Sequence, residues 1–81
     1  MLVSQQIRGA RYALRWSVQQ LADNSGVSVS TVKRLEASDG VPSMSARNLA
    51  SVKTALEAAG VEFIGSPENR PGFRIGDPPV T

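Results

Sequence analysis

The chain of 81 residues contains no cysteine and no histidine. Without Cys there is no disulfide, thiolate metal ligand or thiol nucleophile, and without His there is no imidazole ligand or proton shuttle that titrates near neutral pH. These absences predict a protein that uses no metal and no cofactor. A chain without Cys is also typical of the reducing cytoplasm.

Long apolar runs are missing as well. No run approaches the roughly 20 residues that a membrane-spanning helix needs, and residues 1–11 lack the basic-then-apolar order of a signal peptide. The length suffices for one small domain. We therefore expect a cytoplasmic chain with no membrane partner.

The seven acidic side chains are spread singly along the sequence, and no Gly-rich phosphate loop follows an expected strand. Catalysis needs a positioned acid, base or nucleophile. The sequence therefore predicts that the chain is not an enzyme.

The net charge of +2 is distributed unevenly. Residues 1–34 carry five basic side chains and one acidic side chain, whereas residues 35–81 carry four basic and six acidic ones. A basic half is typical of a surface that faces a polyanion. Ordinary scatter of charge in a small protein is the alternative explanation.

Three short helical patterns fill the first half of the chain. They cover residues 4–14, 18–24 and 29–37, and apolar side chains recur on one face of each. Gln20 completes a capping box at the start of the second helix, and Gly26 ends that helix because glycine adopts positive φ without steric conflict. The expected N-caps are Ser4, Ser17 and Ser28.

The second half predicts one longer helix and a hairpin. Gly and Pro interrupt the helical pattern at residues 38–42, and a helix with Leu49, Val52 and Leu56 on its apolar face then runs from Ser43 or Ser45 to Gly60. Two strand-like runs follow, separated by turn formers. The predicted fold is mostly α, a bundle of four to five helices followed by a short C-terminal β-hairpin. Its expected units are residues 1–60 as the helical domain, 61–75 as the hairpin, with strands at 61–64 and 72–75, and 76–81 as a flexible tail.

Four residues in the second and third helical patterns carry the functional argument: Ala22, Gly26, Val32 and Leu35. Two helices that cross at roughly 90–120° through a tight turn need a small residue at the crossing, a Gly in the turn and branched apolar residues under the second helix. These four meet that need. The opposite side of helix 29–37 is then left facing outward.

At these positions the sequence resembles the lambda-repressor-like (XRE, or Cro/repressor-type) helix-turn-helix regulators of bacteria and phages. The resemblance covers about two-thirds of the chain, roughly residues 4–60. The residues that carry it are Ile7-Arg8-Gly9-Ala10-Arg11, Arg15-Trp16-Ser17, Leu21-Ala22-Asp23-Asn24-Ser25-Gly26-Val27-Ser28, Ser30-Thr31-Val32-Lys33-Arg34-Leu35-Glu36 and Pro42-Ser43.

The resemblance implies a cytoplasmic regulator of transcription that binds double-stranded DNA and reads the major groove with helix 29–37. Of the implied base contacts, Arg34 suits guanine through its bidentate fork, Val29 suits a thymine methyl, and Ser30 discriminates weakly. The implied contacts to the DNA backbone are Ser17, Ser28, Thr31 and Lys33.

Three further points concern charged and polar residues around this helix. Many family members have Gln where this chain has Val18, so the phosphate contact expected there falls to Gln19, which faces another direction by about 100°. The resemblance also implies a structural salt bridge between Arg11 and Glu36. Arg8 and Arg15 have two interpretations, phosphate contact or surface charge, and the sequence does not decide between them.

The hairpin suggests a second partner besides DNA. We expect its apolar residues to cover the core or to form the seam of a homodimer, since related regulators bind paired half-sites about 34 Å apart. The alternative function is that of an antitoxin or adaptor of the same fold, in which the hairpin binds a partner protein by strand addition. The residues concerned are Phe63, Ile64, Phe73 and Ile75.

Overall fold

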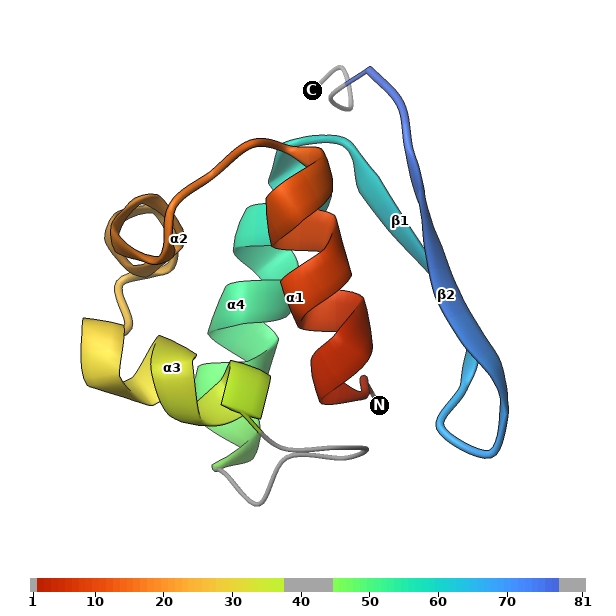
Figure 1. Cartoon of the computed structure of the whole chain (residues 1–81), viewed down its shortest axis with the longest axis horizontal. Coiled ribbons are helices and arrows are strands. Elements are labelled where there is room, and N and C mark those ends of the chain that lie inside the picture. The colour runs from red at the N-terminus through yellow and green to blue at the C-terminus, as the bar shows by residue number, and fades with distance from the viewer. Residues whose placement is uncertain (1, 38–44, 78–81) are drawn as a thin grey trace.

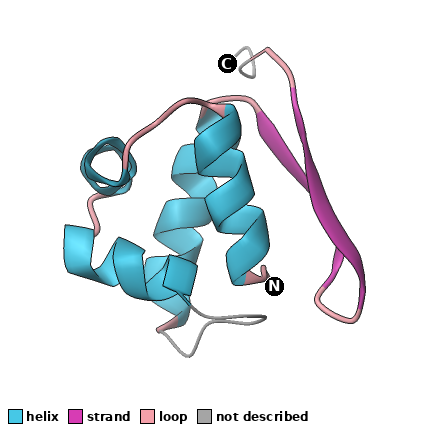
Figure 2. Ribbon diagram, viewed as in Figure 1, coloured by secondary structure: helices cyan, strands magenta, loops and turns pink. Residues whose placement is uncertain are grey.

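The computed structural model of the chain describes residues 2–37 and 45–77. This part is mostly helical and ends in an antiparallel β-hairpin (Figures 1 and 2). The coarse fold class predicted from the sequence is therefore confirmed. In chain order the elements are α1 (Ser4–Ala13), α2 (Val18–Ser25), α3 (Val29–Ala37), α4 (Ala46–Ala58), β1 (Val61–Ser66) and β2 (Asn69–Ile75).

Helices α1 and α4 lie side by side in the middle of the molecule, as Figure 1 shows. On one side α2 packs on α4, and α3 packs on both α1 and α2. On the other side β2 contacts α1 and β1 contacts α4. The hairpin and α3 consequently occupy opposite ends of the molecule in Figure 1.

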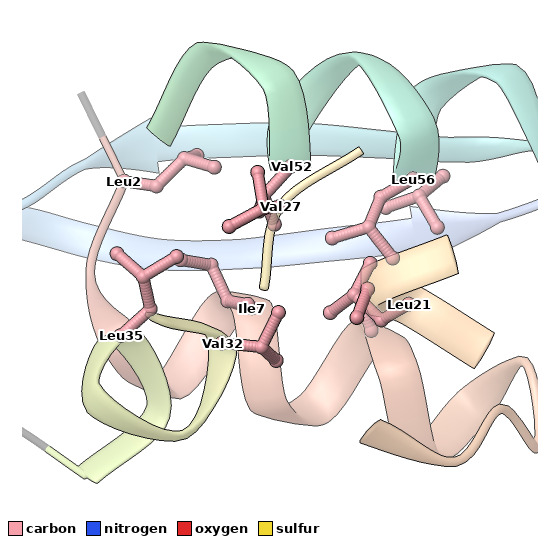
Figure 3. Close-up of a cluster of buried hydrophobic side chains, with 11 residues drawn as sticks. Leu2, Ile7, Leu21, Val27, Val32, Leu35, Val52 and Leu56 are labelled. Atoms are coloured by element: carbon pink, nitrogen blue, oxygen red, sulfur yellow. The ribbon is translucent and has the colours of Figure 1, made fainter. Parts of the chain in front are cut away.

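A single cluster of buried apolar side chains joins all four helices and the first strand (Figure 3). The stripes predicted from helical spacing supply most of it, while Leu14 and Leu49 lie at its edge, half-buried. Leu2, Val27 and Val61 come from outside those stripes. The cluster consists of Leu2, Ile7, Ala10, Leu21, Ala22, Val27, Val32, Leu35, Val52, Leu56 and Val61.

The prediction that Ser4 caps α1 is wrong. Val3 occupies the N-cap position, and its backbone N–H donates to Oε1 of Gln6 at 2.9 Å. Leu2 and Val3 are only 4% and 5% exposed. Because these two apolar residues enter the core, Ser4 becomes the first helical residue and is itself fully buried.

The other helix ends differ from the prediction by a few residues. Helix α1 ends before Leu14, and α2 extends through Ser25. Of the two caps considered for α4, Ser45 is the one observed, since its side chain accepts from the backbone N–H of Asn48 at 3.3 Å. The alternative cap Ser43, the helix break at 38–42 and all of the predicted tail except residues 76 and 77 lie outside the described residues.

The hairpin strands are longer than predicted, and only Pro67 and Glu68 separate them. Val61 pairs with Ile75 and Phe63 with Phe73, in a register that becomes irregular between Ile64 and Ser66. The turn formers that appeared to fill a long loop are therefore mostly strand residues.

Two contacts hold the hairpin against α1. The amide Nε2 of Gln6 donates to the backbone carbonyls of Gly72 at 2.7 Å and Ile64 at 3.2 Å, which belong to opposite strands. One turn further along α1, Gly9 faces the ring of Phe73 so closely that a Cβ there would lie 2.8 Å from a ring carbon. The hairpin therefore packs closely on α1 at Gly9, which has no side chain, and is hydrogen-bonded to α1 by the amide of Gln6.

Candidate nucleic-acid interface

Helix α3 has one buried face and one exposed face. Val32 and Leu35 are fully buried in the core cluster. Ser30, Lys33 and Arg34 are exposed on the other side. We refer to these three residues as the outer face of α3.

The connection from α2 sets how α3 is presented. Gly26 adopts a left-handed conformation with φ +72°, and its N–H donates to the carbonyl of Ala22 at 2.9 Å. No atom lies within 4 Å of a Cβ built on Gly26, so glycine is needed here for its backbone conformation and not for space. Val27 then turns into the core, and the Oγ of Ser28 accepts from the N–H of Thr31 at 3.2 Å.

The three predicted base-contacting residues do not share one environment. Ser30 and Arg34 are exposed on the outer face. Val29 is half-buried and packs against the core cluster, so less of its side chain is left for a thymine methyl. The helical pattern did not reveal this because Val29 belongs to the first turn of α3, where the tight connection through Val27 brings it onto the core.

The predicted backbone-contacting residues are mostly engaged in local hydrogen bonds. Ser17 forms the expected capping box with Gln20: its Oγ accepts from the Gln20 N–H at 3.0 Å, and its N–H donates to Oε1 of Gln20 at 2.7 Å. Gln19 donates to a carboxylate oxygen of Asp23 at 2.9 Å.

The remaining three of these residues lie on or beside α3. The Oγ of Ser28 donates to the hydroxyl of Thr31 at 2.8 Å. Lys33 extends into solvent from the outer face. Ser28 is exposed and Thr31 half-buried, and this hydrogen bond places the two hydroxyls beside each other at the first turn of α3.

Arg11 and Glu36 form the ion pair that the resemblance implied, and it joins α1 to α3. Nε and Nη2 of Arg11 donate to the two carboxylate oxygens of Glu36 at 2.7 and 2.8 Å, and both side chains are more than nine-tenths buried. The hydrogen bond to Glu36 raises the pKa of Arg11 above its ordinary value, although burial acts in the opposite direction. Arg11 therefore carries its charge throughout the physiological pH range.

Arg8 contacts the same residue of α3. Its Nη1 donates to the backbone carbonyl of Glu36 near the end of the helix. Of the two interpretations that the sequence left open for Arg8, neither included this contact within the molecule. One sequence feature indicates this contact. Arg8 and Arg11 are three residues apart, which places both side chains on the same side of a helix.

The apolar hairpin residues divide into two groups. Phe63 and Phe73 pack against the core cluster, whereas Ile75 is 44% exposed. Ile64 lies half-buried across the sheet from Gly72. Within the described part of the hairpin, covering the core is therefore the role of the two phenylalanines.

Two classes of site receive no support from residues 2–37 and 45–77. These residues contain no group of three Asp or Glu placed to hold a metal ion. None of their helices is long and apolar enough to cross a bilayer.

Comparison with known proteins finds no family model that matches this chain and no curated protein that matches it.

Proposed function

We propose that the chain is a sequence-specific DNA-binding regulator of transcription, in which α2 and α3 act as a helix-turn-helix and α3 reads the major groove. The observation that carries the proposal is the division of α3 into a face that is fully buried at Val32 and Leu35 and an outer face of polar and basic side chains. A helix of this kind, held by its apolar side, fits the width of the major groove.

The charges of the outer face support this function because they are unpaired. Lys33 and Arg34 form no ion pair with any residue that the structure describes. Glu36, the acid nearest to them on the same helix, is already bound to Arg11. Two free cations on an exposed helix attract phosphate, and the fork of Arg34 suits the O6 and N7 atoms of guanine.

The dimensions of the chain suit a homodimer on paired half-sites. It measures 32 × 29 × 21 Å, so the centres of two copies packed side by side lie about 30 Å apart. Half-sites one helical turn apart are separated by about 34 Å. We expect the preferred operator to be a palindrome for this reason.

The decisive experiment begins with selection of bound duplexes from a random library. Binding of the selected duplex and its single-base variants is then measured for the wild type, Arg34→Ala and Arg74→Ala. We expect Arg34→Ala to lose about 1–3 kcal/mol of binding free energy at one base position. Arg74 is a matched control, because it is an exposed arginine in the hairpin, at the end of the molecule remote from α3.

Two results would contradict this assignment. If Arg34→Ala weakens binding to every duplex equally, Arg34 contacts a phosphate and not a base. If the wild type binds no duplex above background, the chain is not a DNA-binding regulator.

An antitoxin or adaptor role, with the hairpin binding a partner protein, is the second candidate. It is favoured by the exposure of Ile75 and by the sheet itself, which has only two strands in the described residues and so leaves an outer edge on each. Salt separates the candidates. A regulator with at least six phosphate contacts loses about 10³-fold or more in affinity between 50 and 200 mM salt, whereas an adaptor that binds only protein shows no duplex binding.

A further inference from the structure

Arg15 adopts a backbone conformation that suits glycine. Its φ of +60° lies in the left-handed region, which L-residues disfavour because Cβ approaches the following carbonyl oxygen. Among the described residues, Arg70 in β2 is the one other non-glycine with positive φ, at +52°.

The left-handed turn at Arg15 is required by the end of α1. The N–H of Arg15 donates to the carbonyl of Tyr12 at 3.0 Å, and the N–H of Trp16 donates to the carbonyl of Arg11 at 3.1 Å. These two hydrogen bonds form the usual left-handed termination of a helix, in which glycine is the preferred residue at the position of Arg15. The fold therefore explains the turn but not the arginine.

The side chain of Arg15 makes no compensating contact. It is exposed, and within residues 2–37 and 45–77 it has no hydrogen bond and no ion pair. It lies two residues before Ser17, which is at most about 7 Å of extended chain. The backbone of Arg15 therefore lies close to Ser17, a residue that the family resemblance implies as a contact to the DNA backbone.

We propose that Arg15 binds a phosphate of the DNA beside Ser17, and that it occupies a glycine position because its charge serves binding at the expense of stability. Non-glycine residues held in strained backbone conformations cluster at functional sites. The inference rests on the proposed function and adds to it a contact outside α3.

The test uses Arg15→Gly, Arg70→Gly and Arg15→Lys. Both glycine variants remove one positive charge and one left-handed arginine, but Arg70 lies in the hairpin. We expect both to raise the Tm by roughly 2–5 °C. Arg15→Gly alone should weaken binding to the selected duplex about three- to tenfold and lower the slope of log K against log salt by about 0.9. Arg15→Lys keeps the charge and should keep the wild-type slope.

The outcomes distinguish failure of this inference from failure of the proposed function. If the wild type binds the duplex and Arg15→Gly has the same small effect on the slope as Arg70→Gly, Arg15 is not a phosphate contact, while the proposed function stands. A Tm that falls in Arg15→Gly overturns the inference as well, because the side chain then stabilises the fold. If the wild type binds no duplex, both proposals fail.

Discussion

Gln6, Gly9 and Arg11 lie within two turns of α1, and they face two parts of the molecule: Gln6 and Gly9 face the hairpin, whereas Arg11 faces α3. Gln6 bonds to backbone carbonyls of both strands, Gly9 receives the ring of Phe73, and Arg11 holds Glu36 of α3. Because α1 contacts both the hairpin and α3, substitutions at Gln6 or Gly9 test how the hairpin is attached. A substitution that breaks the Arg11–Glu36 pair tests how α3 is attached.

Gly9→Ala is expected to destabilise the fold although alanine is the better helix former. The new Cβ would lie 2.8 Å from a carbon of the Phe73 ring, and overpacking of this kind lowers the free energy of unfolding by about 1–3 kcal/mol. In a Phe73→Leu background the ring atoms are gone, and the same substitution should stabilise by up to about 1 kcal/mol. Urea denaturation of the wild type, Gly9→Ala, Phe73→Leu and the double variant measures the change in the free energy of unfolding in both backgrounds. The same sign in both backgrounds would mean that Gly9 is not shaped to Phe73.

The two ion pairs of the described residues should differ in their contribution to stability. Glu36→Gln leaves the buried guanidinium of Arg11 without its countercharge and should lower the free energy of unfolding by about 3 kcal/mol. Glu62→Gln removes the partner of Arg74 from a pair that is about two-thirds exposed. It should change the free energy of unfolding by less than about 0.5 kcal/mol. Thermal and chemical denaturation test this comparison. Equal effects would show that burial of the Arg11 pair does not matter.

At the scale of elements, the hairpin depends on α1 for its stability, since an isolated two-stranded hairpin is marginal in water. Gln6→Leu leaves the carbonyls of Ile64 and Gly72 without their shared donor. Each partly buried acceptor left in this way weakens the structure by about 1 kcal/mol, the lower end of the range for a fully buried group. We expect hydrogen exchange in β1 and β2 to accelerate more than exchange in α2 and α3. Uniform acceleration would indicate that the hairpin and helices open together.

Helix α3 and the hairpin lie on opposite sides of the described part of the molecule (Figure 1). A dimer seam on the hairpin would thus leave α3 free for DNA. Since Phe63 and Phe73 already pack on the core, Ile75 is the exposed apolar residue that such a seam would use.

We expect sedimentation equilibrium to give a homodimer for the wild type and a folded monomer for Ile75→Arg. Tyr12→Arg is the matched control: Tyr12 is also an exposed large apolar residue, at 67% exposure, but belongs to α1, and this variant should remain dimeric. A wild-type monomer at high concentration would remove the dimer from the proposed function. A dimer that survives Ile75→Arg would place the seam elsewhere.

Local chemistry made much of the helical part predictable from the sequence. The capping box of Ser17 and Gln20, the left-handed Gly26 and the buried pair Val32 and Leu35 depend on residues a few positions apart, so spacing alone reveals them. The bounds of α3 follow from the same short-range signals and match residues 29–37.

Contacts between distant segments were decided only by the tertiary structure. The burial of Ser4 follows from Leu2 and Val3 entering the core, and the hydrogen bonds from Gln6 to the hairpin and from Arg8 to α3 join residues 28 or more positions apart. Which side of each helix is apolar can be read from the amino-acid sequence, because it depends on a local period of 3.6 residues. Which element meets that side depends on how the helices and hairpin pack, and no local spacing encodes it.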